Sequence, residues 1–343
     1  MTQKLFSATA ALLAAGIVFN AATARAADAV ADFYKGKTVT IYVGLAAGGL
    51  YSNFAQILSR HINRHIPGNP NVIVQHQPGA GGMIATNAVY NTLPKDGTVL
   101  IGLNGGMTKR VVLGEPSARF DPRQWNWLGG WNETVNDCTV WSNAPATTLE
   151  QAKTTEVIIG ANDTGNATYT TPMTINYFLG TKFKVVPGYG GGAQVRLAME
   201  RGEVHGFCGQ FEGWKSVKPE WLKEGRLAHL VQLASKRSAD MPNTPLLSEF
   251  ARNDEEARIF EFIQSGLDDR AMVVAPGVPA DRVAALRKAY MDTLADKEFL
   301  AEANGQQFEI NPVTADELKA FVERIYTLSP DSIAKIRKAQ GVD

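Results

Sequence analysis

The chain has 343 residues, its 34 Lys and Arg balance its 34 Asp and Glu, and 45% of its residues are hydrophobic. This length allows two ordinary domains, each with an apolar core of its own. Lys and Arg form neither a cluster nor a basic stripe along the sequence. Composition therefore favours a globular protein and argues against a nucleic acid partner.

Residues 1–26 have the pattern of an export signal. Lys4 supplies a positive start, residues 5–19 are mostly apolar, and Ala24-Arg25-Ala26 has the small-x-small form of a cleavage site. A spanning helix is the alternative, but the apolar stretch is short, and no later segment approaches roughly 18 apolar residues. We expect cleavage near Ala26 and a soluble mature protein, in the periplasm if the cell is Gram-negative. Removal of Lys4 and Arg25 takes the formal charge to about −2.

Strands and helices are expected to alternate in the first half of the mature chain. Hydrophobic patterns predict strands over residues 37–43, 71–75 and 98–103, and helices over 52–66 and from Gly82 to Asn91. Ser52 is the expected N-cap of the first helix, and Pro67-Gly68 ends it. This order predicts a mixed, mostly parallel sheet flanked by helices.

The alternation resumes after a stretch without clear periodicity. Residues 116–143 hold Trp125, Trp127, Trp131 and Trp141 and are interpreted as a domain crossover. Strands are expected at 156–160, 184–186, 203–208 and 271–275, and helices at 171–179, 193–201, 281–295 and 316–338. We expect residues 27–132 and 257–343 to form one domain, residues 133–256 to form the second, and a ligand cleft to lie between them.

Three apolar runs end at clusters of glycine and small polar residues. Residues 38–45 lead into 46–52, residues 157–161 into 162–166, and residues 185–186 into 187–192. A strand that feeds a glycine-rich helix start leaves unpaired N–H groups and the positive end of a helix dipole at one point, which suits a small anion. A tight turn that needs positive φ is the alternative for any single loop. The presence of three such loops, together with the export signal, favours an anion receptor.

The export signal and seven short motifs, in order, resemble a known family. They are Phe33-Tyr34-Lys35-Gly36-Lys37, Ala47-Gly48-Gly49, Gln77-Pro78-Gly79-Ala80-Gly81-Gly82, Pro94-Lys95-Asp96-Gly97, Gly188-Tyr189-Gly190-Gly191, Gly202-Glu203-Val204 and Ala275-Pro276-Gly277-Val278-Pro279-Ala280-Asp281-Arg282, after the export signal. The chain resembles the extracytoplasmic solute receptors of tripartite tricarboxylate transporters, the Bug family. The resemblance covers nearly the whole mature chain. It implies an α/β, two-domain clamshell of the periplasmic-binding-protein type II, which holds a carboxylate through backbone N–H groups, hydroxyls and water rather than through an arginine.

The resemblance also implies a set of ligand-binding positions. They are Ala47, Gly48, Gly49, Ser52, Gly79, Ala80, Gly81 and Asn104 in the first domain, and Thr164, Gly165, Asn166, Thr168, Tyr189, Gly190 and Gly191 in the second. The chain departs from the family pattern at four places. Ser52 stands where Asp is common, Asp163 and Asn166 stand where Gly and Ser are frequent, and His205 replaces the usual Asp. These departures bear on which acid is bound.

Several other residues have a functional and a structural interpretation. Cys138 and Cys208 are the two cysteines, and export permits a disulfide between them, with two buried thiols as the alternative. His61 and His65 have metal-ligand spacing, but no H-E-x-x-H pattern or third ligand accompanies them, so a solvated helix face is favoured and no metal is expected. Tyr189 and His205 are ligand contacts or packed residues. The tryptophans suit a domain-junction core better than stacking on an aromatic ligand.

The favoured function is capture of a small organic acid and its delivery to the membrane subunits of a tripartite tricarboxylate transporter. A receptor that presents the ligand to a membrane sensor is the alternative. An enzyme is less favoured, because the G-x-S-x-G, P-loop and dinucleotide-binding motifs are all missing. We expect no cofactor and a monomeric protein.

Overall fold

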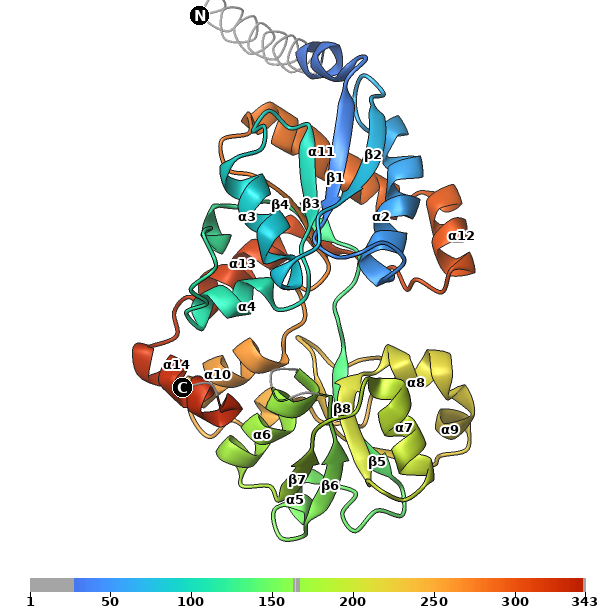
Figure 1. Cartoon of the computed structure of the whole chain (residues 1–343), viewed down its shortest axis with the longest axis vertical. Coiled ribbons are helices and arrows are strands. Elements are labelled where there is room, and N and C mark those ends of the chain that lie inside the picture. Colours follow the sequence, from blue (N-terminus) through green and yellow to red (C-terminus); the bar gives the residue numbers. More distant parts are fainter. Residues whose placement is uncertain (1–27, 163, 165–166, 342–343) are drawn as a thin grey trace, which may run out of the picture. The chain divides into compact units, whose positions relative to one another are not determined.

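The computed structural model describes residues 28–162, 164 and 167–341. The chain divides into two compact units, which are coloured along the sequence in Figure 1. Of the described residues, the first unit comprises 28–104, 117–131 and 271–316, and the second comprises 105–116, 132–162, 164, 167–270 and 317–341. The predicted export signal lies outside the described residues. Within the described part, no helix is both long and apolar enough to cross a membrane.

The first unit contains a sheet in the order β11-β4-β10-β3-β1-β2. Strands β3, β1 and β2 run parallel to one another, whereas β10 and β11 pair antiparallel with their neighbours. The strands are β1 (Thr38–Val43), β2 (Asn71–His76), β3 (Val99–Gly102), β4 (Asn126–Gly130), β10 (Ala271–Val274) and β11 (Val313–Thr314). The predicted β-α-β order therefore accounts for the parallel half of this sheet.

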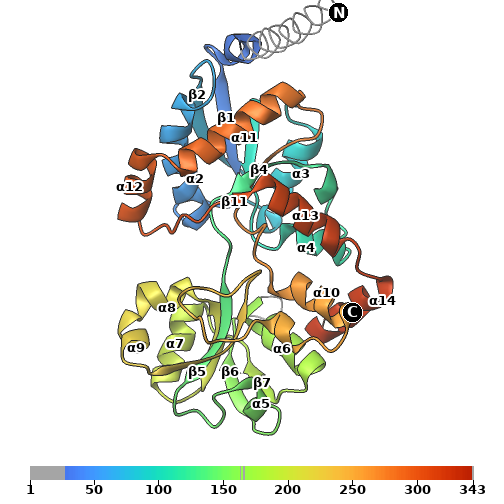
Figure 2. The same ribbon diagram turned by 180° about the vertical axis from the view of Figure 1, so that it is seen from behind.

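Helices cover this sheet and bury its apolar side chains. Figure 2 shows α11 running across the strands of the first unit. The core centres on Phe54, whose ring stacks on that of Trp131 with 3.8 Å between centroids. The helices are α2 (Leu50–His61), α3 (Met83–Asn91), α11 (Ala280–Leu294) and α12 (Lys297–Gly305), with short 3-10 turns η1 (Ile62–Arg64), η2 (Ala80–Gly82) and η3 (Pro122–Gln124). Trp125, Trp127 and Trp131 are buried, which confirms the core interpretation of these tryptophans.

The second unit contains a sheet in the order β7-β6-β8-β5-β9. Strands β7, β6 and β8 run parallel, and β5 pairs antiparallel with both β8 and β9. The strands are β5 (Asn136–Trp141), β6 (Val157–Gly160), β7 (Phe183–Val186), β8 (Gly206–Gln210) and β9 (Leu227–Leu233). The helices assigned to this unit are α4 (Met107–Val112), α5 (Leu149–Ala152), α6 (Ala167–Leu179), α7 (Gly192–Glu200), α8 (Glu212–Val217), α9 (Pro219–Lys223), η4 (Leu247–Phe250), α10 (Asp254–Gln264) and α14 (Pro330–Gln340). Helix α13 (Ala315–Ile325) begins in the first unit and ends in the second.

The boundaries of the two units differ from those expected from the sequence. Residues 105–116, 257–270 and 317–341 belong to the second unit. Helix α14 in the last of these segments packs on α6 and on α10. The stretch 116–143 is also more regular than predicted, since it contains β4 and β5, and the units change between Trp131 and Asn132. The tail is broken into two helices at Ser329, whose side chain caps α14 before Pro330.

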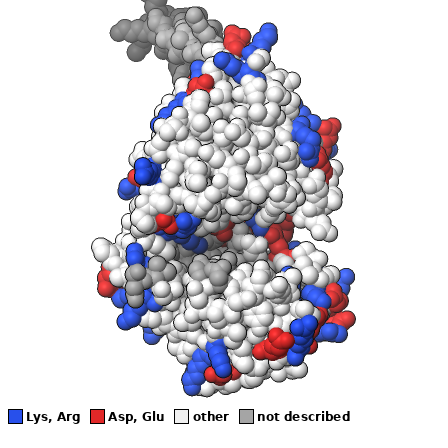
Figure 3. Space-filling model, in the orientation of Figure 1, with Lys and Arg blue, Asp and Glu red and all other residues white. Residues whose placement is uncertain are grey.

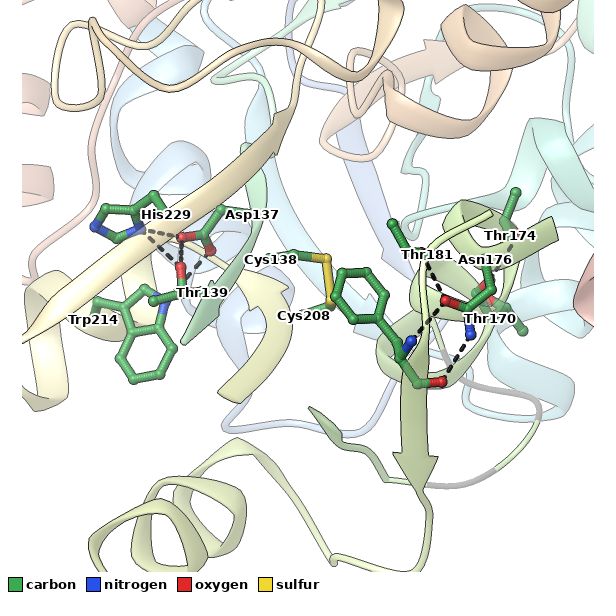
Figure 4. Close-up of a disulfide and its surroundings, with 11 residues drawn as sticks. Asp137, Cys138, Thr139, Thr170, Thr174, Asn176, Thr181, Cys208, Trp214 and His229 are labelled. Carbon is green, nitrogen blue, oxygen red and sulfur yellow. Dashed lines mark hydrogen bonds and ion pairs between the residues drawn. A yellow bond between two sulfur atoms is a disulfide. The ribbon is translucent and has the colours of Figure 1, made fainter. Parts of the chain in front are cut away.

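A disulfide joins two neighbouring strands of the second sheet. Cys138 of β5 lies directly opposite Cys208 of β8 in the antiparallel register, and their sulfur atoms are bonded. The predicted pairing is confirmed, and the alternative of two free thiols is wrong. The bond closes a loop with a sequence separation of 70 residues. Figure 4 shows it between the Asp137 cluster on one side and helix α6 on the other.

We predict that replacing both cysteines by alanine destabilises the mature protein by roughly 2–4 kcal/mol, because the unfolded chain gains the entropy of an open loop. Urea denaturation of the variant measures the loss. Wild-type protein with reductant is the control and should unfold at the midpoint of the variant. Titration of two thiols in native, unreduced protein would contradict the pairing.

The solvated face predicted for His61 is wrong. Its side chain is buried against Phe299 of α12, and its Nε2 atom lies 2.7 Å from a carboxylate oxygen of Glu302. His61 also lies close to Asp296 and Glu298, a grouping that could hold a metal ion. Arg64 already bridges both of these carboxylates, so a guanidinium supplies the positive charge there. The sequence pattern misses this contact because α12 lies far along the chain.

Asp296 stabilises the start of α12 and joins it to η1, the turn that follows α2. Its carboxylate accepts hydrogen bonds from the N–H groups of Phe299 and Glu298 and pairs with Arg64, which lowers its pKa to about 2. Because the pKa is lower in the folded state, this stabilisation is complete above the unfolded value near 3.8 and is lost as the pH falls toward 2.

We predict that Asp296→Ala costs about 1–2 kcal/mol at pH 7, since both the cap and the ion pair are lost. Urea denaturation at pH 7 and at about pH 2.5 should show the cost shrinking in acid. Asp331→Ala, which removes an exposed first-turn acid of α14, is the control and should stay within about 0.5 kcal/mol of wild type. A cost that is the same at both pH values would contradict the assignment.

Candidate functional site

The three predicted loops of the first unit meet at one edge of its sheet. Strands β3, β1 and β2 are parallel neighbours, so their carboxyl ends lie together. The loops after β1 and β2 are in close contact, because a Cβ atom added to Gly44 would lie 2.6 Å from the Cα atom of Gly82. Asn104, which follows β3, donates from Nδ2 to the carbonyl of Gly81 over 2.9 Å. The sequence predicts that these loops lie together, because it predicts that the strands before them are parallel neighbours.

The first loop leads into α2, which begins two residues earlier than expected. Its N-cap is Gly49, and no described side chain caps this end of the helix. The prediction of Ser52 as N-cap is therefore wrong. Ser52 lies in the first turn and is buried; its Oγ atom accepts a hydrogen bond from the N–H of Gly48 (3.3 Å) and lies 2.8 Å from His76 Nε2. Ser52 holds the glycine loop in place, with His76 as a partner that sequence reasoning missed.

The second loop has an unusual backbone that a glycine-rich sequence permits. Gly79, Gly81 and Gly82 have φ values of 141°, 63° and 95°, and Ala80 has φ 48°. Asn104 supports this loop through Nδ2, while its buried Oδ1 atom has no hydrogen-bond partner among the described residues. Gly79, Ala80 and Gly81 therefore stand at the predicted edge, and Asn104 braces them.

The predicted loops of the second unit also lie at the carboxyl edge of parallel strands. Asn162, after β6, donates its N–H to Thr168 Oγ1 over 3.0 Å and accepts from the N–H of Gly188, after β7, over 2.5 Å. Thr164 is exposed. Asp163, Gly165 and Asn166 lie outside the described residues. The two loops are thus tied together at Asn162.

Tyr189, Gly190 and Gly191 differ in what they offer a ligand. The Tyr189 ring packs against the apolar cluster of the second unit and passes over Gly160, which is the packed alternative left open by the sequence. Gly190 donates its N–H to Gln194 Oε1 over 2.6 Å. Gly191 is the N-cap of α7, where no described side chain supplies a cap. The starts of α2 and α7 therefore match, since each helix has a glycine as N-cap and no described side chain caps it.

Helix α7 also borders a cavity of about 650 Å³ in the second unit. Its wall is part polar and part apolar. It includes Thr168, which the sequence analysis named as a ligand-binding position, and Asn162 and Arg196, which it did not name as such. Further polar wall residues come from α6, β5 and β8: Thr170, Thr171, Thr174, Asn136, Asp137 and Gln210. The signal that could have found Arg196 is an arginine beside Val195 and one turn from Met199, on the buried side of a helix.

Two comparisons find similar proteins, although no family model matches the chain. A protein of Cupriavidus necator described as "UPF0065 protein in gbd 5'region" is 26% identical over 263 residues, which cover 73% of this chain and 75% of that protein. A TctC solute binding protein from Polaromonas aligns with a TM-score of 0.73 and 20% identity, over 89% of this chain and 99% of that structure. The predicted resemblance to the Bug family is confirmed.

Two further solved structures share the Bug fold. The periplasmic binding protein BugD aligns with a TM-score of 0.59 and 20% identity, over 90% of this chain and 99% of its own. MatC from Rhodopseudomonas palustris, solved with bound malate, aligns with a TM-score of 0.55 and 18% identity, over 89% and 99% of the two chains. The expected periplasmic-binding-protein-like α/β fold is therefore confirmed.

His205 and the two cysteines have structural partners in the second unit. His205 Nδ1 accepts the N–H of Ile158 over 3.0 Å, so this histidine has a structural partner. Cys138 and Cys208 are bonded to each other, which removes both as nucleophiles. Acidic and basic side chains are interspersed on the face shown in Figure 3.

Proposed function

We propose that this protein is an exported, periplasmic solute-binding protein that captures a small carboxylate-bearing solute and delivers it to the membrane subunits of a tripartite tricarboxylate transporter. The observation that carries the proposal is the matched pair of helix starts, α2 in the first unit and α7 in the second. Each follows a parallel strand or its loop, and each has a glycine N-cap with no side-chain cap among the described residues.

These helix starts suit a carboxylate for a physical reason. The first N–H groups of a helix have no partner within the helix, and the helix dipole adds a partial positive charge at the same end. Hydrogen bonds to a charged group are worth about 1.5–3 kcal/mol each. MatC, which shares the fold, was solved with bound malate, and this supports an organic acid as the solute here.

A thermal-shift screen of the mature protein, from Ala27 onward, tests the proposal. The protein is stripped of bound ligand and mixed with carboxylates and amino acids, with sugars and metal ions as controls. An acid at about 100 times its dissociation constant should stabilise the folded state by ~2.7 kcal/mol and raise the melting temperature by a few degrees. Stabilisation by sugars alone would contradict the proposal.

We predict that Gly49→Val and Gly191→Val each weaken binding of the acid found in the screen roughly tenfold or more, because a side chain would occupy the anion's place. Gly49 has φ −94° and Gly191 has φ 165°, so both backbones are extended and accept any residue. No described atom lies within 4 Å of a Cβ added at either position. Isothermal titration measures the loss of affinity. We expect no folding defect in either variant, because both positions have room for a side chain.

Gly305→Val is the matched control for both variants. Gly305 is exposed near the end of α12, and its added Cβ would also meet no described atom within 4 Å. Its affinity should equal that of wild type. Unchanged affinity in both Gly49→Val and Gly191→Val would remove the helix starts from the binding site.

A further inference from the structure

Most charged groups that line the cavity of the second unit already have polar partners. Lys109 donates to the carbonyls of Ile263 and Ser265, and Arg110 pairs with Glu115. Asp269 accepts the N–H of Gly106 over 2.8 Å. These groups need no ligand to satisfy them.

Asp137 is the buried acid of this cavity and is likewise satisfied. It bonds to Thr139, lies 2.7 Å from Nδ1 of His229 and accepts a long hydrogen bond from Trp214 Nε1 at 3.4 Å. Figure 4 shows these side chains gathered around the carboxylate. Asp137 is therefore committed to an internal network.

Arg196 is the exception. Its side chain lines the cavity, the residue is only 8% exposed, and its Nε atom has no hydrogen-bond partner among the described residues. No described carboxylate forms an ion pair with Arg196. Its guanidinium lies over the Trp214 ring, with 5.6 Å between Cζ and the ring centroid, in a cation–π contact. Burial alone lowers the pKa of this guanidinium. A buried charge without a partner costs free energy of folding, and a bound anion would offset that cost.

Two glycines leave room for the guanidinium. A Cβ atom added to Gly192 would lie 3.3 Å from Arg196 Nη1, and one added to Gly213 would lie 3.2 Å from the same atom. Neither glycine has the positive φ that would itself require glycine. Gly192 is the first residue of α7, so the charged head lies beside the positive end of that helix.

Helix α6 contributes a part of the cavity wall that is suited to a polar solute. Thr168, Thr171 and Thr174 are spaced three residues apart on α6, and all three line the cavity. The Oδ1 atom of Asn162, which also lines it, is buried without a partner among the described residues. Hydroxyl and amide groups of this kind bind hydroxyl or carbonyl groups of a ligand.

We infer that Arg196 binds a carboxylate of the solute directly, as a bidentate partner beside the start of α7, and that the threonine face of α6 selects organic acids that carry a further hydroxyl or carbonyl group. This inference rests on the proposed function, because it names the residue that recognises the acid. It also departs from the arginine-free carboxylate binding that the family resemblance implies.

Isothermal titration of ligand-stripped protein tests the inference, with malate, succinate and adipate as probes and dimethyl malate as the uncharged analogue. Arg196→Gln should lower the affinity for the acids roughly 10- to 100-fold, and Arg196→Lys should lower it less. Any binding of dimethyl malate should be insensitive to both changes. Malate should bind more tightly than succinate, which lacks the hydroxyl group.

Arg201→Gln is the matched control, because Arg201 ends the same helix with a side chain that is 62% exposed. Its affinities should equal those of wild type. Without ligand, Arg196→Gln should melt no lower than wild type, since it removes an unpaired buried charge. If Arg196→Gln fails to fold, Arg196→Lys alone decides, and wild-type affinity in that variant overturns the inference.

The outcomes separate the inference from the proposed function. If the wild-type protein binds neither these probes nor any other acid of the screen, both the inference and the proposed function are overturned. Acid binding that is unchanged in Arg196→Gln overturns the inference alone. A thermodynamic coupling between Arg196→Gln and Asp163→Asn in ligand-free protein would show that Arg196 is paired internally, and it would overturn the inference as well.

Discussion

Parallel pairing of three neighbouring strands is the constraint on which the proposed binding site depends. In each sheet, parallel strands place their carboxyl ends at one edge, so loops separated by tens of residues meet there. The antiparallel strands β10, β4 and β5 complete the sheets but contribute none of the predicted glycine loops. The positions of the glycines are thus a consequence of strand direction.

Buried charged groups of the second unit differ in whether they have internal hydrogen-bond partners. Asp137 and Glu133 are satisfied from within, the first by His229, Thr139 and Trp214, and the second by the N–H and hydroxyl groups of Ser235. Arg196 has no such partner among the described residues. A group that binds a ligand must give up internal partners, so stability is lower where binding is possible. Among the charged groups that line the cavity of the second unit, this contrast sets Arg196 apart.

The disulfide and the α12 contacts show how distant segments stabilise local features. Cys138 and Cys208 are 70 residues apart in sequence, yet they lie opposite each other in one strand pair. His61 and Asp296 illustrate the same point, because the helix that buries His61 begins more than 200 residues later. Each contact joins segments that are far apart in the sequence.

The sequence alone determined the parallel strands of both sheets, the helices that follow their glycine-rich turns, and the family resemblance, because hydrophobic period and turn chemistry are properties of neighbouring residues. Strands β4, β5 and β9 were not predicted from it. It did not determine the role of Ser52, the burial of His61 or the isolation of Arg196. Those depend on which segments pack against them, such as β2 on α2, α12 on α2, and α8 on α7. Tertiary packing decides whether a polar side chain finds a partner, and hence whether it supports the fold or remains available to a ligand.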